Sequence, residues 1–500
     1  MKNIVIVGAG SAGLITAAHF KNYWEDDVNI TVYYDSKCKN ISVGESTTPS
    51  IVDFLTEVVG ISVNDFLKRT NSTIKLGVNF KNWIPGTEYF HGFDEIEEDR
   101  YTGTPFSIIY SLLNDLPYNG GVHNNKATNL ILQSPEPIGN EYALHIDVQE
   151  FSDFLFEELK DKVNFIDDIV EDVNVKDKNI ESIRCKNSGV VKADFFIDAS
   201  GFDKVLFKHL DSEWEDISDI LPIDRAIPYQ IPNNSEEIPS YTLAEATKNG
   251  WIWRIPIGNR YGTGYMYSSK FTTDEEAMED YNSWLLENYN EELKTDRIIK
   301  YNPGYYKELW IGNCFAVGLT SGFMEPLEAF SLHSMMELIE YFLYCNPTIK
   351  NLSYNRKFLN TVSYEYLGGI TKFIALHYNT NRLDSKFWKY MTTNKMEWVR
   401  DLDEKCKEEC HVIKESLVSD SYDSIVETES QVQIANGLNM INKEAMSEYL
   451  FSINNELREE VLEYAALEYT SIEKYRKEFE YISHKEFLES IKVGDYDDDK

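Results

Sequence analysis

The feature that most constrains the fold is a glycine-rich turn within the first 13 residues. Residues 3–7, Asn-Ile-Val-Ile-Val, form a short apolar run typical of a buried parallel strand, and Gly8-Ala9-Gly10-Ser11-Ala12-Gly13 follows directly. In this GxGxxG pattern the first glycine permits a tight turn, the second lets the backbone approach a pyrophosphate, and the third allows close packing of helix and strand. A helix that begins near Ser11 would present free amides to that pyrophosphate. The order predicts a dinucleotide-binding βαβ unit.

A second strand is expected at about residues 28–34, and it ends beside Asp35, whose carboxylate can accept a hydrogen bond from a ribose hydroxyl. The fingerprint alone leaves FAD and NAD open. Two later stretches favour FAD: residues 195–201 and residues 310–318 each resemble a flavoprotein strand that ends at a glycine turn. Flavoproteins usually place Asp where this chain has Asn313. Because the sequence has no second GxGxxG for a nicotinamide, we expect a separate reductase to supply reduced flavin.

Composition excludes several classes of partner. The chain has 84 acidic and 48 basic residues and a formal net charge of −36, so it repels polyanions, and we expect no nucleic-acid binding. The sequence contains no run of about 18 apolar residues, so we expect no membrane span. Six cysteines at scattered positions are typical of a cytoplasmic protein. Cys406, Cys410 and His411 lie close in sequence, but no fourth ligand is evident, so we predict no metal site. The sequence leaves homo-oligomer formation open.

Hydrophobic periodicity predicts an α/β core followed by helices. Residues 72–83 alternate between apolar and polar side chains and predict a half-buried strand. A helix is expected around residues 145–160, and further strands near 163–175, 181–186, 190–198 and 251–267. From about residue 332 onward, apolar residues recur at helical spacing. The predicted fold class is therefore α/β: a Rossmann-like three-layer core, a second sheet and a mainly helical C-terminal region.

The expected domain organisation follows from this pattern. Residues 1–345 would form the cofactor-binding core, with substrate-site segments inserted at about 72–150 and 205–300. Residues 346–500 would form a mainly helical region that covers the substrate site.

Three motifs in the sequence point to one family. Residues 250–256 (GWIWRIP) contain WxWxIP, residues 43–49 read VGESTTP, and residues 323–328 read FMEPLE. Together they resemble the signature, the flavin-contacting loop and the catalytic-glutamate segment of flavin-dependent halogenases of the tryptophan-halogenase-like type. The resemblance extends over roughly residues 1–390. The glycine turn and the resemblance together imply FAD-contacting residues at Gly8, Gly10, Ser11, Ala12, Gly13, Asp35, Gly44, Glu45, Ser46, Thr47 and Gly318.

The resemblance also implies two catalytic residues. Lys75 stands eight residues before Trp83, a spacing similar to that between the family's catalytic lysine and its Asn-Trp pair. Without the resemblance, Lys75 would be read as a solvated lysine on the polar face of a strand. An amine or ammonium is suited to receive hypohalous acid, either as a hydrogen-bond donor or as a haloamine. Glu328 is expected in the first turn of a helix that Pro326 begins, where it would polarise the halogenating species or remove a ring proton.

The same resemblance implies three further groups of residues. On the WxWxIP strand, Trp251, Trp253 and Ile255 share one face by alternation and, with Pro256, would line the tunnel that separates flavin from substrate. Phe90-His91-Gly92-Phe93 is similar to the segment that lines the indole pocket, so His91 and Phe93 are candidate substrate contacts; a buried structural histidine is the alternative. Residues past 400 resemble the tryptophan enzymes little, which makes free tryptophan a doubtful substrate.

One segment departs from the family pattern. The glutamate is usually followed by Ser-Thr-Gly, and here Ala329-Phe330-Ser331 follows Glu328. Phe330 and Ser331 therefore align with the family's halide site. We hypothesise that the bulky aromatic favours bromide or iodide over chloride.

The resemblance implies a flavin-dependent halogenase, in which reduced FAD, oxygen and a halide form hypohalous acid that halogenates an electron-rich aromatic substrate by way of Lys75 and Glu328. Two alternatives stay open at this point: a flavin-dependent aromatic monooxygenase of related fold, and a catalytically inactive flavin-binding protein. Formation of a halide-dependent product distinguishes them.

Overall fold

The computed structural model describes residues 2–38, 45–93, 99, 104–116, 130–132, 142–233, 235, 237–346, 352–408, 428–478 and 481–493. The chain divides into two compact units, each assembled from three stretches that are distant in sequence. The first unit comprises Met1–Ser72, His145–Ser218 and Lys300–Leu367. The second comprises Thr73–Leu144, Asp219–Ile299 and Gly368–Lys500.

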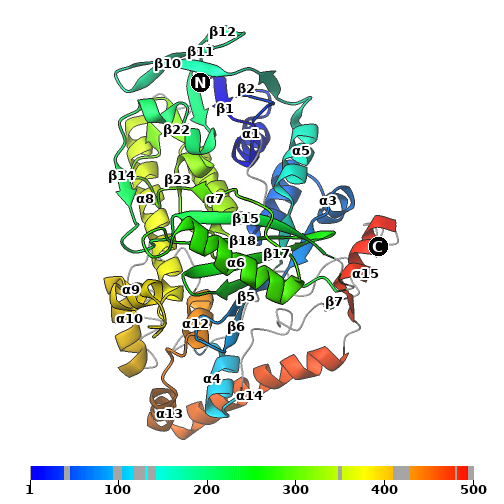
Figure 1. The fold of residues 1–500 in the computed structure, drawn as a ribbon, viewed down its shortest axis with the longest axis vertical. Coiled ribbons are helices and arrows are strands. Elements are labelled where there is room, and N and C mark those ends of the chain that lie inside the picture. The colour runs from blue at the N-terminus through cyan, green and yellow to red at the C-terminus, as the bar shows by residue number, and fades with distance from the viewer. Residues whose placement is uncertain are drawn as a thin grey trace. The chain divides into compact units, whose positions relative to one another are not determined.

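A six-stranded sheet forms the centre of the first unit (Figure 1). Its order is β21 (Trp310–Ile311), β22 (Cys314–Ala316), β13 (Phe195–Asp198), β1 (Asn3–Val7), β2 (Asn29–Tyr34) and β9 (Asn164–Asp167). All neighbouring pairs are parallel except β21 with β22. Parallel strands end at the same edge, so the glycine turn after β1 lies beside the ends of β2 and β13.

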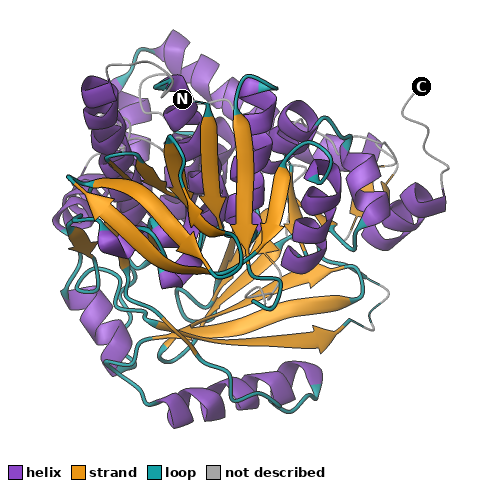
Figure 2. Cartoon of the chain, turned by 90° about the horizontal axis from the view of Figure 1, so that it is seen from above, coloured by secondary structure: helices purple, strands orange, loops and turns teal. Residues whose placement is uncertain are grey.

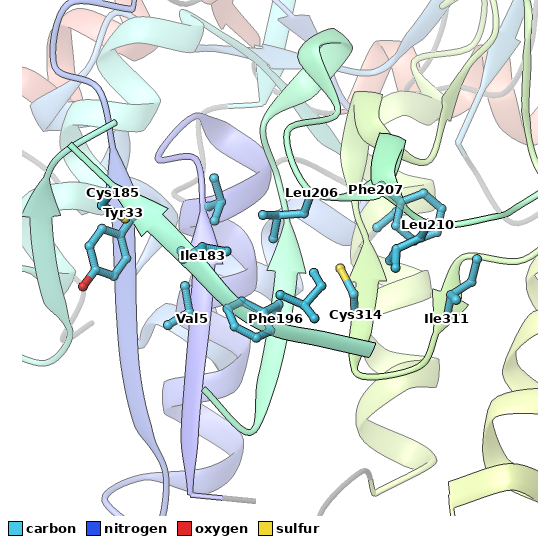
Figure 3. Close-up of a cluster of buried hydrophobic side chains, with 13 residues drawn as sticks. Val5, Tyr33, Ile183, Cys185, Phe196, Leu206, Phe207, Leu210, Ile311 and Cys314 are labelled. Atoms are coloured by element: carbon cyan, nitrogen blue, oxygen red, sulfur yellow. The ribbon is translucent and has the colours of Figure 1, made fainter. Parts of the chain in front are cut away.

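Layers on both faces bury this sheet. Helix α1 (Ser11–Trp24) packs against α5 (Val148–Leu159) and α7 (Phe330–Tyr344). A second, antiparallel sheet of β10 (Val170–Lys176), β11 (Asn179–Cys185) and β12 (Gly189–Val191) contributes Ile183 and Cys185 to a core cluster with Val5 and Phe196 of the central sheet (Figure 3). Burial on both faces explains why β1 is apolar without alternation. The predicted three-layer, Rossmann-like core is confirmed.

Shorter elements complete the first unit. They are β3 (Glu45–Ser46), α2 (Ser50–Asp53), the π-helix η1 (Phe54–Val59), α3 (Val63–Arg69), the 3-10 turns η2 (Gly201–Asp203), η3 (Phe207–His209) and η4 (Gly318–Thr320), and a small sheet of β14 (Trp214–Asp216), β20 (Gly304–Tyr306) and β23 (Gly322–Phe323).

The predicted second sheet is the centre of the second unit. Its order is β19 (Ile299–Lys300), β15 (Arg225–Pro232), β18 (Arg260–Tyr267), β17 (Gly250–Ile257), β16 (Thr242–Ala246), β5 (Gly77–Lys81) and β6 (Glu88–Gly92). Strands β17 and β18 form the hairpin expected at 251–267, whereas β16 and β5 run parallel. Helix α6 (Asp274–Tyr289) begins with a capping box of Thr273 and Glu276 and packs Tyr281 against Ile252 and Tyr265.

The last third of the chain is mainly helical, as predicted, and is drawn in yellow to red in Figure 1. Figure 2 colours the helices, strands and loops of the whole chain. Its helices are α8 (Leu352–His377), α9 (Lys386–Thr393), α10 (Glu397–Glu408), α12 (Thr428–Gly437), α13 (Lys443–Ser452), α14 (Asn455–Glu478) and α15 (His484–Val493). Helix α14 packs against α4 (Phe106–Leu113). The sequence did not predict β24 (Tyr481–Ser483), which pairs with β7 (Leu130–Leu132). None of the helices within the described ranges is long and apolar enough to cross a membrane.

The expectation for residues 72–83 was wrong in one respect. The segment forms two strands, β4 (Thr73–Lys75) and β5, with a break at Leu76. Every residue from 73 to 80 is buried, so neither face of the segment is exposed to solvent. Alternation of apolar and polar side chains indicates that the two faces differ in chemistry, and here the polar face is enclosed by other parts of the chain.

Candidate active site

The glycine turn adopts the geometry that its sequence predicts. Gly8 has φ 113°, and a Cβ built on it would lie 2.4 Å from the carbonyl oxygen of Ala199. A Cβ on Gly13 would lie 1.9 Å from the carbonyl oxygen of Gly8. No other residue type fits either position without movement of the backbone, because the obstructing atoms belong to the main chain.

Three of the segments assigned to the flavin come together in the first unit: the glycine turn at residues 8–13 and the stretches 195–201 and 310–318. Gly8 lies against Ala199, just after β13, and a Cβ on Gly318 would lie 2.7 Å from the Cβ of Ala12. The hydroxyl of Thr320 donates a hydrogen bond to the carbonyl of Gly201 at 3.1 Å. The ends of β1, β13 and β22 therefore form one continuous cradle, although their sequences are far apart.

The N-terminus of α1 is suited to an anionic pyrophosphate. Its N-cap is Gly10, which has no side chain to occupy the first amides, and the first turn carries no acidic residue. The helix dipole adds a partial positive charge at this point. Asp35 follows β2, the neighbour of β1, and one of its oxygens accepts the amide of Lys37 at 2.9 Å. These residues fit the nucleotide half of FAD.

The predicted flavin-contacting loop is seen from Glu45 onward, and Gly44 lies outside the described residues. Strand β3 pairs Glu45 with Ile146 and Ser46 with His145 of β8 (Ala143–Ile146). Burial raises the pKa of Glu45 to about 7. Thr47, two residues after Glu45, is also buried. The loop is thus held at its C-terminal end inside the first unit.

His333 is a site residue that the sequence analysis missed. Its Nδ1 lies 3.1 Å from the Thr48 hydroxyl and 3.0 Å from the Ser50 hydroxyl, so it ties the loop after β3 to α7. Its ring also contacts that of Phe330 at a centroid distance of 5.7 Å. The one signal available in the sequence was its position five residues after Glu328.

Two polar residues next to the cradle have structural partners. Asp198, at the end of β13, accepts the amides of Ser200, Leu206 and Phe207 at 2.7–3.0 Å and so fixes the turn that follows. Asn313 accepts the amide of Ile180 at 2.8 Å and donates to the carbonyl of the same residue at 3.0 Å. An aspartate at position 313 would lack the donor, which gives a physical reason for the departure from the usual flavoprotein residue.

Glu328 precedes α7 and does not lie in its first turn, so that expectation was wrong. The helix begins at Phe330. Ala329 adopts a left-handed backbone conformation with φ 63°, so a right-handed helix that started at Pro326 could not continue through it. Glu328 is buried. Phe330 and Ser331 are the first two helical residues, and the side chain of the N-cap residue, Ala329, makes no capping hydrogen bond. The positive end of the helix dipole at the start of α7 favours an anion.

Lys75 is fully buried in the second unit, with 0% of its surface exposed. Its Nζ lies 4.9 Å from the ring centroid of Phe93. The structure thus brings together a predicted catalytic residue and a predicted substrate contact. His91, on β6, is buried, stands opposite Val78 of β5 and contacts the ring of Phe373. The reading of Lys75 as a solvated surface lysine is excluded.

The WxWxIP residues are buried on β17, which lies between β16 and β18. The rings of Trp251 and Trp253 contact each other at 6.3 Å in an edge-to-face arrangement, as residues two apart on one strand face should. Gly264 makes room for Trp253, because a Cβ there would lie 2.1 Å from the indole ring. The carbonyl of Pro256 accepts the Thr73 hydroxyl at 2.7 Å, which links this motif to β4. Ile255 is also buried.

The burial of His333 predicts an acid-sensitive contribution to stability. Desolvation lowers its pKa from 6.5 to about 4, so between these values the unfolded chain binds a proton that the folded chain does not. The neutral, buried His333 therefore contributes fully to the free energy of unfolding above pH 6.5, and this contribution is lost as the pH falls toward 4. Between about pH 7.5 and about pH 5 we expect a loss of about 2 kcal/mol.

Urea unfolding of the parent and of His333→Gln at both pH values measures this term. The other titrating groups, including Glu45 with its raised pKa, are common to both proteins and cancel in the comparison. An equal loss of stability in the two proteins would contradict the prediction.

Comparisons with known proteins agree with this arrangement. The family model described as tryptophan halogenase matches residues 3–449. The tryptophan 7-halogenase RebH of Lentzea aerocolonigenes is 29% identical over 424 residues, covering 77% of this chain and 78% of its own. The crystal structure of the tryptophan 6-halogenase SttH of Streptomyces toxytricini superposes with a TM-score of 0.85 at 25% identity, covering 98% of this chain and all of that one. Tar14, the tryptophan C-6 chlorinase from taromycin biosynthesis, gives a TM-score of 0.86 at 27% identity and covers 98% of this chain and 100% of its own.

These similarities lend no support to a monooxygenase or an inactive flavin-binding protein. The family is flavin-dependent, and the cradle around the glycine turn fits its FAD cofactor. The protein is an FAD-dependent halogenase that uses a halide as co-substrate, and the chain belongs to the tryptophan halogenase family.

Proposed function

We propose that the protein halogenates an electron-rich aromatic ring, with Lys75 and Glu328 as its catalytic residues. The observation that carries the proposal is the complete burial of Lys75 against the ring of Phe93. Burying an amine away from water costs several kcal/mol, and chains rarely retain such a group without a role for it. A buried amine beside an aromatic ring can hold an electrophilic halogen close to an aromatic substrate.

When bound, reduced FAD supplies the electrons that activate oxygen for oxidation of the halide to hypohalous acid. The amides at the start of α7, at Phe330 and Ser331, would hold the halide. The Nζ of Lys75 would then hold the hypohalous acid by a hydrogen bond or carry its halogen as a haloamine. The carboxylate of Glu328 would take the proton that leaves the substituted ring carbon.

The remaining predicted residues would orient the substrate and exclude water. Phe93 and His91 would contact the aromatic ring, since the first already lies beside Lys75. Trp251 and Trp253 are buried on β17, where Pro256 accepts a hydrogen bond from the Thr73 hydroxyl of β4, and they would keep water away from Lys75. Exclusion of water protects a hypohalous acid or haloamine from side reactions.

We further propose that a separate reductase supplies the reduced flavin, because the sequence has one GxGxxG. The test is an incubation of the protein with FAD, a flavin reductase, NADH, oxygen, a halide and a panel of electron-rich aromatics that includes tryptophan. We expect a halogenated product, detected by its mass and isotope pattern, that depends on every component. Product formation with NADH and FAD but no reductase would contradict the proposed partner, and an oxygenated product without halogen would contradict the proposed reaction.

Phe330 predicts a preference among halides. An aromatic side chain at the first position of α7 would narrow a halide site there and exclude water from it, which would favour anions that lose hydration water easily. We expect turnover with bromide or iodide to exceed that with chloride at equal concentration. The same assay with each halide separately checks this, and a clear preference for chloride would remove the hypothesis.

A further inference from the structure

Lys75 ends β4, which lies beside β8 in the sheet β3-β8-β4, and the chain that continues from it is bonded to the segment before β16. Strands β5 and β16 pair in parallel, with Val78 opposite Thr242. Two residues earlier on each chain, the amide of Leu76 donates a hydrogen bond to the carbonyl of Ser240 at 2.7 Å; we call each such backbone bond between the two segments a rung. Two residues back in the same register, the amide of Ile74 would be expected to meet the carbonyl of Ile238.

An imidazole ring takes the place of that rung. The amide of Ile74 donates to Nε2 of His484 at 3.0 Å, and Nδ1 of His484 lies 3.2 Å from the carbonyl oxygen of Ile238. An amide can only donate and a carbonyl can only accept, so the ring must be neutral with its proton on Nδ1. The two strands therefore separate at this point, and His484 spans the gap between them.

The surroundings of His484 hold the ring in this state. The residue is fully buried, and burial lowers its pKa to about 3. It is the first residue of α15, whose start is fixed by Ser483: the Ser483 hydroxyl accepts the amide of Glu486 at 3.2 Å, and the Glu486 carboxylate accepts the amide of Ser483 at 2.9 Å. Phe487 and Ile491 anchor the helix in the core. His484 lies beyond residue 449, where the family match ends.

We propose that His484 is a positioning residue that sets the location of Lys75. Lys75 stands between the two rungs, one at Ile74 through the imidazole and one at Leu76 through Ser240. Without the ring, a buried amide and a buried carbonyl lose their partners, and the backbone of β4 shifts to recover them. The inference rests on the proposed catalytic role of Lys75.

The substitution His484→Phe tests the proposal, because phenylalanine keeps the ring and removes both hydrogen bonds. We expect kcat for halogenation to fall by about 10²-fold, the effect of a displacement of about 1 Å in a catalytic group. The KM for the aromatic substrate and the Kd for FAD should change by less than about threefold. Oxygen consumption should continue, so the halogenated product formed per oxygen consumed should fall.

Two further variants separate positioning from general destabilisation. His484→Gln supplies an amide donor and a carbonyl acceptor on one side chain and should restore part of the lost kcat. Leu488→Ala removes packing from the same helix and leaves the imidazole in place; it should lower the melting temperature with kcat kept within about threefold.

The outcomes distinguish this inference from the proposal on which it rests. If Lys75→Met is inactive while His484→Phe is as active as the parent, or while Leu488→Ala loses as much kcat as His484→Phe, the positioning role is wrong and the lysine assignment stands. If Lys75→Met still halogenates, the lysine assignment fails, and the positioning role fails with it.

Discussion

Replacement of Lys75 by methionine should reduce kcat for halogenation by about 10³-fold or more, while FAD should bind with unchanged affinity. The magnitude is that expected when a group that donates a proton or forms a covalent intermediate is removed. Methionine preserves much of the volume of the lysine stem, so the core around it keeps its packing. FAD affinity should be kept because the cradle residues Gly8, Ala12 and Gly318 are unchanged in this variant.

Lys81 provides a matched control on the next strand. Its ammonium lies 3.0 Å from Glu245 with 40% of the side chain exposed, a kind of ion pair that contributes at most about 1 kcal/mol. Lys81→Met should therefore leave kcat within about twofold of the parent. FAD affinity is measured by fluorescence quenching, and product by mass spectrometry at saturating FAD. Parental activity in Lys75→Met at equal FAD occupancy would remove the catalytic assignment.

The cofactor cradle could be predicted from the sequence because each of its parts is local. A strand, a turn with glycines at fixed positions and a helix specify a geometry within 13 residues, and steric limits at Gly8 and Gly13 leave few alternatives. The other flavin segments are likewise a strand followed by a glycine turn. Their meeting could be inferred because parallel strands end at one edge of a sheet.

The surroundings of Lys75 could not be predicted in the same way. Alternation over residues 72–83 separates apolar from polar side chains, but it does not say whether the polar face meets water or other parts of the chain. The imidazole that bridges Ile74 and Ile238 comes from a residue 410 positions away. No local sequence pattern marks such a partner, because a single histidine at the start of a helix is common. The role of His484 can be recognised only in the structure, where it bridges two separated backbone segments.

The error at Glu328 has a different cause. Pro326 is a reasonable first residue for a helix, and Glu328, two residues later, would then lie in the first turn. The left-handed conformation of Ala329 breaks that continuity and delays the helix to Phe330. Alanine gives no sequence signal for this conformation, because glycine and asparagine are the residues that normally adopt it. The consequence is that Glu328 stands two residues before the first helical residue of α7.

Replacement of Gly13 by alanine should reduce FAD affinity by at least about 10²-fold. The new Cβ would lie 1.9 Å from the carbonyl oxygen of Gly8, so α1 or the turn must move by more than 1 Å. Gly8 cannot yield easily, because it is itself held against Ala199. Overpacking of this kind also costs about 1–3 kcal/mol of folding stability. Gly60→Ala is the control: Gly60 has φ 81° with open space around its Cβ, so its alanine variant should bind FAD normally at a cost of about 1–2 kcal/mol in stability.

A compensated pair keeps the prediction testable if Gly13→Ala does not fold. Gly318→Ala places a Cβ 2.7 Å from the Cβ of Ala12, and this obstructing atom is a side chain that can be removed. Gly318→Ala should weaken FAD binding, and Ala12→Gly in the same chain should restore most of the loss, leaving the strain of φ 60° at position 318. Titration of each apoprotein with FAD measures the affinities. Equal FAD affinity in Gly318→Ala and the parent would show that the close approach of Gly318 to Ala12 does not shape the cofactor site.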